Sequence, residues 1–165
     1  MKLSLNQKLI YRVACVVTHG DKILLHRGEM DSFYALPGGS VEFGETSIEA
    51  IQREMHEELG ASVETGQLLW VAENFFEYMD KQCHEIGLYY QMSFLGESLK
   101  YNNLNEFEGT EINHRLYFKW FTSDELKHVD VRPTFLKQAL FDLPTHTQVM
   151  ISLDASTRST SGVQL

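Results

Sequence analysis

Residues 39–61 read GSVEFGETSIEAIQREMHEELGA, and the expected fold is built outward from this stretch. Thr46 and Glu49 have the spacing of a capping box, in which a hydroxyl and a carboxylate satisfy free amides of a first helical turn. Gly60 is the residue type that most readily adopts the left-handed conformation at a helix end. Apolar residues recur every three or four positions, at Ile48, Ile51, Met55 and Leu59. The pattern predicts an amphipathic helix over residues 46–59.

Three carboxylates crowd the last turns of this predicted helix. Glu54, Glu57 and Glu58 stand at i, i+3 and i+4, where like charges cost roughly 0.2–0.5 kcal/mol per pair. Anions near a helix C-terminus also oppose the helix dipole, by about 0.3–1 kcal/mol each. A hard divalent cation such as Mg²⁺ or Mn²⁺ turns this repulsion into shared attraction. A solvated acidic face is the ordinary alternative for three glutamates on one helix.

The spacing of the whole stretch resembles the signature of the Nudix hydrolases, enzymes that hydrolyse a nucleoside diphosphate linked to another group. Gly39 and Glu45 are followed by residues 53–60, and every charged and glycine position of that signature is present. Ala61 departs from it, since a larger aliphatic residue is usual there. A fixed pattern over 23 residues is far more specific than a lone glycine-rich loop.

The resemblance implies roles for the residues of this box. It implies that Glu54, Glu57 and Glu58 hold one or more Mg²⁺ ions, with the Gly39 carbonyl as a further ligand. It also implies an ion pair between Glu45 and Arg53 that orients the loop before the helix. A surface ion pair worth under about 1 kcal/mol is the alternative for these two residues.

Residues outside the box are assigned less directly. In many Nudix enzymes a glutamate from a downstream loop acts as general base or extra ligand, and Glu106, Glu108 and Glu111 compete for that role here. Glu111 is preferred because it is nearest the strand that ends at Trp120, although glutamates in a polar loop are often simply solvated. Candidate substrate-binding residues are Arg27, Phe33 and Phe75, although aromatic residues in strands usually belong to the core.

The rest of the chain predicts strands around this helix. We expect β-hairpins from residues 8–18 with 22–26 and from 67–79 with 83–95, a loop over 96–113, a strand over 115–121, a short helix capped by Ser123, and a second over 134–141. Strands with interleaved helices favour an α/β/α sandwich with a mixed sheet, as the resemblance also implies. We expect one domain over residues 1–151 and a disordered tail over 152–165.

Composition limits the partners. The formal net charge of -9 and the lack of basic patches argue against nucleic acid. We see neither a secretory signal nor an apolar membrane span, so we expect a cytoplasmic protein. Cys15 and Cys83 have no metal-type or redox-type spacing, which predicts free buried thiols. Dimerisation is common in the family, but no interface pattern in the sequence predicts a homodimer.

Two functions remain open from the sequence. In the first, metal-activated water hydrolyses a phosphoanhydride bond of an ADP-ribose-like compound, another nucleoside diphosphate derivative or a nucleoside triphosphate. In the second, a catalytically silent Nudix-like domain senses such a nucleotide. The intact glutamates favour the enzyme, because a pure sensor has no need for mutually repelling carboxylates. The sequence does not decide the substrate or the number of metal ions.

Overall fold

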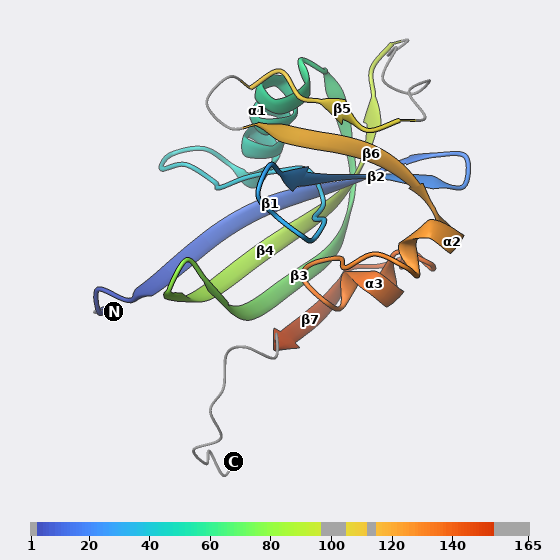
Figure 1. Ribbon diagram of the computed structural model, residues 1–165. Helices are drawn as coiled ribbons and strands as arrows, with labels where there is room; N and C mark the ends of the chain where they lie inside the picture. Colours follow the sequence, from blue (N-terminus) through green and yellow to red (C-terminus); the bar gives the residue numbers. More distant parts are fainter. Residues whose placement is uncertain (1–2, 97–104, 112–114, 154–165) are drawn as a thin grey trace.

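The sheet consists of two halves that are joined only at one end of β1. The computed structural model describes residues 3–96, 105–111 and 115–153. Its strands follow the order β5-β6-β2-β1-β4-β3-β7 (Figure 1). β1 (Gln7–His19) and β2 (Lys22–Gly28) pair only beside their turn, where Thr18 faces Ile23 and His19 faces Lys22. Away from the turn the two strands diverge.

The remaining elements complete a mixed sheet between helices. They are α1 (Ser47–Leu59), β3 (Val63–Tyr78), β4 (Lys81–Phe94), β5 (Phe107–Glu108), β6 (Leu116–Thr122), α2 (Ser123–Leu126), α3 (Leu136–Ala139) and β7 (Gln148–Leu153). The β1–β4 and β3–β7 pairs are parallel and the other pairs are antiparallel. Both predicted hairpins and the mixed sheet are therefore confirmed.

Residues 35–41 fill the gap between the diverging strands. On one side the Val13 amide donates to the Gly39 carbonyl at 2.9 Å. On the other, His26 and Ala35 exchange two backbone hydrogen bonds of 2.9 and 2.8 Å. Gly38 has φ +138°, and a Cβ there would collide with the Val13 backbone, so only glycine fits this close approach. The start of the box is thereby attached to the middle of β1.

Each face of the sheet carries its own core. Val13, Cys15 and Val17 of β1 pack with the buried face of α1, whereas Ala14 and Val16 pack with residues of α2, α3 and the segments around them. The alternation follows from the two-residue period of a strand. Helices thus lie on both faces, which confirms the α/β/α sandwich. Both cysteines are buried and free, as predicted.

Several details of the predicted elements were wrong. Ile48 is 44% exposed, so the buried face of α1 relies on Ile51, Met55 and Leu59 instead. The cap of α2 is Thr122 rather than Ser123. The predicted loop at 96–113 contains β5, and the predicted tail begins inside β7, where Ser152 is buried.

Other parts of these predictions cannot be compared with the fold. Residues 97–104, 112–114 and 154–165 lie outside the described part of the chain. No helix among residues 3–96, 105–111 and 115–153 is long and apolar enough to cross a membrane.

Candidate active site

Both ends of α1 are fixed by side chains. At the start, the Glu49 amide donates to the Thr46 hydroxyl at 3.2 Å and the Thr46 amide donates to the Glu49 carboxylate at 2.8 Å, which is the predicted capping box. At the other end Gly60 is left-handed with φ 60°. The Thr110 amide and hydroxyl donate to the carbonyls of Glu58 and Glu57 at 2.7 and 2.8 Å. The segment after β5 is therefore attached to the acidic end of the helix.

Arg53 connects the carboxylates of the box. Its guanidinium pairs with Glu45 at 2.7 Å, so the predicted ion pair is present. The same group also contacts Glu54 at 2.9 Å and Glu57 at 3.1 Å and donates to the Ser40 carbonyl at 3.1 Å. Arg53 thus ties the loop before α1 to the helix itself.

Glu58 is a buried carboxylate with an unsatisfied oxygen. Its side chain is 4% exposed and Oε2 has no hydrogen-bond partner. The pKa of Glu58 is raised to about 8, chiefly by burial and in smaller part by the charges of Glu54 and Glu111, while the charge of Arg12 acts in the opposite direction. Burial also raises the pKa of Glu54, although Arg53 partly opposes that shift.

The oxygen atoms of Glu54, Glu57, Glu58 and the Gly39 carbonyl are of the kind that binds a hard divalent cation, but the side chains are not arranged in a coordination shell. In the described part of the chain, no three His, Cys, Asp or Glu side chains stand close enough together to hold a metal ion as they are. Arg53 occupies oxygens of Glu54 and Glu57. The Glu54 carboxylate packs directly on Gly39, where a Cβ would displace it. Clustered carboxylate oxygens that repel each other suit Mg²⁺ or Mn²⁺, and one of them, Oε2 of Glu58, is buried without a partner.

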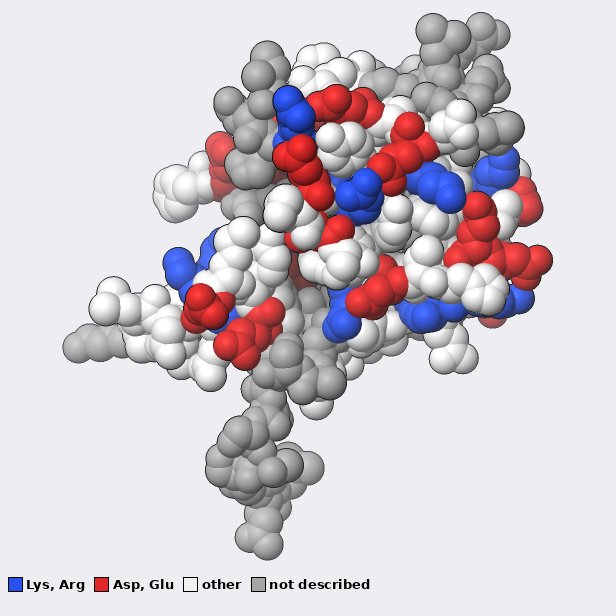
Figure 2. Space-filling view, viewed as in Figure 1, with Lys and Arg blue, Asp and Glu red and all other residues white. Residues whose placement is uncertain are grey.

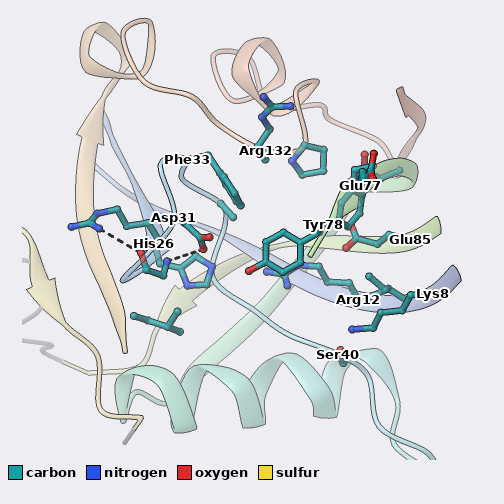
Figure 3. Close-up of a pocket in the computed structure, with 18 residues that line it drawn as sticks. Lys8, Arg12, His26, Asp31, Phe33, Ser40, Glu77, Tyr78, Glu85 and Arg132 are labelled. Carbon is teal, nitrogen blue, oxygen red and sulfur yellow. Dashed lines mark hydrogen bonds between the residues drawn. The ribbon is translucent and has the colours of Figure 1, made fainter. Parts of the chain in front are cut away.

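A cavity of about 380 Å³ opens beside the box (Figure 3). Arg12 of β1 and Ser40 line the cavity (Figure 3), and Arg12 donates to the carbonyls of Gly38 at 3.0 Å and Leu36 at 3.3 Å. The charge of Arg12 also acts on Glu54 and Glu58 of the box. Further basic and aromatic residues line its wall, among them Lys8, Arg27, Arg132, Phe33, Phe76 and Tyr78. Acidic and basic side chains are interspersed on the face seen in Figure 2.

The structure separates the three residues expected to bind substrate. Arg27 and Phe33 line the cavity. Phe75 does not line it, because its ring stacks on His84 at a centroid distance of 4.3 Å. Strand alternation puts the neighbours Asn74 and Phe76 on the cavity side instead, which corrects the prediction for Phe75.

The competing downstream glutamates also lie in different places. Glu106 accepts two hydrogen bonds from Arg27, the shorter of 2.6 Å, and one from the Tyr34 hydroxyl at 3.2 Å. Glu108 is 3.8 Å from the exposed Arg115. The charge of Glu111 is among those that raise the pKa of Glu58. Glu111 also follows Thr110, whose amide donates to the Glu58 carbonyl, so it lies near the acidic end of α1.

Several polar residues of the cavity were not predicted from the sequence. Four of them are Arg12, His26, Asn74 and Glu85, which lie on β1, β2, β3 and β4. Each lies inside a run that the sequence predicts as a strand. The available signal was a polar side chain on a strand position whose neighbours two residues away are apolar.

Comparison with known proteins gives a consistent result. The NUDIX domain model matches residues 8–139. An ADP-ribose pyrophosphatase of Methanocaldococcus jannaschii is 35% identical over 88 residues, which cover 52% of this chain. The match spans only 51% of that pyrophosphatase, about half its length.

Two solved structures resemble this fold. A UDP-X diphosphatase has a TM-score of 0.61 at 21% identity, with 87% of this chain and 67% of that chain covered. A MutT mutator protein from Bacillus halodurans has a TM-score of 0.59 at 20% identity, with coverage of 85% and 89%. At these identities the two similarities support the fold.

Proposed function

This chain belongs to the Nudix family, and we propose that it hydrolyses a phosphoanhydride bond in a small nucleoside diphosphate derivative. The observation that carries the proposal is the unpartnered oxygen of buried Glu58, which lies among other carboxylates beside a cavity of about 380 Å³. A buried carboxylate in such surroundings is costly unless a cation compensates it.

Glu54, Glu57 and Glu58 would hold one or more Mg²⁺ or Mn²⁺ ions, and the Gly39 carbonyl is the further ligand that we propose. That carbonyl accepts the Val13 amide and keeps a second lone pair. When bound, the metal neutralises phosphate charge and makes a water molecule more acidic. Glu57 must leave Arg53 to take part, and Arg53 remains held by Glu45 and the Ser40 carbonyl.

Other residues of the chain position the substrate. Lys8 and Arg12 bring positive charge from one face of β1 into the cavity, where they can attract the phosphates. Phe33 and Phe76 offer apolar surface for the nucleoside. Glu111 is our candidate to accept a proton from the attacking water, because its charge acts on Glu58 across the end of α1.

The substrate that we propose is ADP-ribose or a chemically similar nucleoside diphosphate derivative. Support comes from the partial match to an ADP-ribose pyrophosphatase and from a cavity that is both basic and aromatic. Nucleoside triphosphates are the competing class. We propose a cytoplasmic location for this activity on small nucleotides.

The test is a nucleotide panel assayed with Mg²⁺ for release of phosphate, pyrophosphate or nucleoside monophosphate. Wild type should cleave a member of the panel, chelator should abolish cleavage, and added Mg²⁺ or Mn²⁺ should restore it. Glu57→Gln should lower kcat/KM by at least about 100-fold, as loss of a metal contact does. Glu64→Gln, which changes an exposed strand glutamate, should retain wild-type turnover.

Each alternative outcome has a clear meaning. Near wild-type hydrolysis by Glu57→Gln would exclude the assigned metal ligands. Activity that persists in chelator would require different chemistry. Nucleotide binding without turnover by any member of the panel would favour the sensing domain over the enzyme.

A further inference from the structure

The bottom of the cavity is built from three buried polar side chains that the proposed chemistry does not use. His26, Asn74 and Glu85 line the cavity and are 7%, 4% and 5% exposed. Figure 3 labels His26 and Glu85 among the lining residues, and they come from β2 and β4. Polar groups at this depth are costly unless they have partners.

The side-chain amide of Asn74 has a hydrogen-bond partner for its NH₂ group but none for its oxygen. It faces Glu85 directly across the β3–β4 ladder, and its side chain hydrogen-bonds the Glu85 carboxylate. An ionised carboxylate can accept hydrogen bonds but cannot donate them, so the NH₂ group of Asn74 is the donor of this bond. The Oδ1 atom of Asn74 is buried without a partner.

His26 presents a second acceptor. Its ring bonds the Leu36 backbone through an N–H, which leaves Nδ1 as a buried atom without a partner. Burial lowers the pKa of His26 to about 3, so the ring stays neutral and Nδ1 keeps its lone pair at physiological pH. The His26 ring packs against the ring of Phe118, with the two centroids 5.4 Å apart.

The cavity therefore presents both kinds of hydrogen-bonding partner to a ligand. Its bottom offers acceptors, namely Nδ1 of His26, Oδ1 of Asn74 and the carboxylate of Glu85. Lys8 and Arg12 on β1 offer only donors and positive charge. A nucleotide satisfies both sets when its phosphates face the basic residues and its N–H or O–H groups face the bottom.

We propose that His26, Asn74 and Glu85 bind a vicinal pair of hydrogen-bond donors on the substrate. This proposal rests on the proposed function, because it takes the ligand to be a nucleotide. Two parts of a nucleotide carry such a pair: the cis-diol of a ribose and the adjacent N–H groups of a guanine edge. A ligand without the pair leaves these buried acceptors unsatisfied, so it should bind more weakly by about tenfold or more.

The experiment measures binding in chelator, without metal or turnover. Isothermal titration calorimetry compares the 5′-monophosphates of adenosine, 2′-deoxyadenosine, guanosine and inosine. If the diol is read, 2′-deoxyadenosine monophosphate binds about tenfold more weakly than the three ribonucleotides. If the base edge is read, guanosine monophosphate binds about tenfold more tightly than the inosine compound. Equal affinities for all four would overturn the proposal.

Variants assign the preference to these residues. Asn74→Leu and Glu85→Gln should reduce the preference to less than about threefold, since the first removes the amide oxygen and the second replaces one carboxylate oxygen with an NH₂ donor. Glu73→Gln is the matched control, because Glu73 precedes Asn74 on β3 and is exposed, and it should keep the wild-type preference. An unchanged preference in a folded Glu85→Gln variant would contradict the proposal.

Variants of His26 test the proposal independently, even where the Asn74 and Glu85 variants lose stability. His26→Phe keeps a ring against Phe118 and removes the acceptor, whereas His26→Asn places an amide oxygen near the position of Nδ1. The preference should be lost in the first variant and partly kept in the second. Equal behaviour of the two variants would exclude a role for Nδ1.

Failure of this proposal differs from failure of the proposed function. Selective binding without hydrolysis would leave the pocket assignment intact and remove the activity. Hydrolysis without selectivity among the four nucleotides would do the opposite.

Discussion

Glu58 and Glu85 are two buried carboxylates that lie within the influence of the same arginine. Burial raises the pKa of both, and the charge of Arg12 opposes both shifts. Glu85 accepts hydrogen bonds from Asn74 and Tyr89, whereas one oxygen of Glu58 has no partner. The difference teaches that burial alone does not identify a metal ligand. In our proposal, the carboxylate with the unpartnered oxygen binds the cation, and the carboxylate that is already hydrogen-bonded orders its neighbours.

The largest expected effect is the difference between two variants in which one of these carboxylates is replaced by an amide. Glu58→Gln should lower kcat/KM by more than about 100-fold and abolish the rise in Tm that Mg²⁺ causes, because it removes a metal ligand. Glu85→Gln should keep the Mg²⁺-dependent rise in Tm and act mainly on KM. Thermal unfolding with and without Mg²⁺, together with steady-state kinetics, measures both effects. Loss of the Mg²⁺ response in Glu85→Gln would remove the distinction.

The two sites also differ in how far the sequence predicts them. The box could be predicted because its information is local: capping residues, helical spacing and the left-handed Gly60 act within one stretch. Arg53 and Glu45 are eight residues apart and meet through the same local geometry. Thr110 contacts Glu57 at the end of α1 across 53 residues of sequence. The sequence therefore prefers Glu111 only by its place nearest the strand that ends at Trp120, and no local pattern links it to the helix.

The bottom of the cavity shows the limit more clearly. His26, Asn74 and Glu85 come together only when β2, β3 and β4 have found their partners. The two-residue period of a strand does not say which of its two faces lines a cavity. The sequence therefore predicts Phe75, whereas Asn74 and Phe76 line the cavity. A one-residue shift in strand register moves every side chain to the opposite face of the sheet, and the register is set by long-range strand pairing.

A second prediction uses pH to sharpen the contrast. The pKa of Glu58 rises from an ordinary 4.5 to about 8 in the folded protein, so the native state holds a proton that the unfolded state has lost. The contribution of Glu58 to stability is then fully present below 4.5 and is lost as pH rises through about 8. Without metal, Tm should fall by several degrees over this window, since about 1 kcal/mol shifts Tm by roughly 2–4 °C.

Mg²⁺ separates the contributions of the two carboxylates. Glu85 has a raised pKa too and contributes a loss of the same sign, but it lies outside the proposed ligand set. Mg²⁺ should therefore raise Tm more near pH 8 than near pH 5 in wild type, because the metal needs ionised Glu58. Differential scanning fluorimetry across pH measures the difference. A Mg²⁺ response that is equal at both ends of the range would contradict the role of Glu58.

The smallest expected effect concerns the source of the charge around Glu58. Glu111→Gln removes a negative charge that raises the pKa of Glu58, so the metal-free fall in Tm should move to lower pH by less than about one unit. Glu108→Gln is the matched control from the same segment, because the Glu108 side chain is exposed and its 3.8 Å contact is with Arg115. It should leave the profile in place. A shift of the same size in both variants would mean that the net charge of the segment, rather than the position of Glu111, acts on Glu58. A shift in Glu111→Gln alone would link the downstream glutamate to the buried one through space, a contact that no spacing in the sequence encodes.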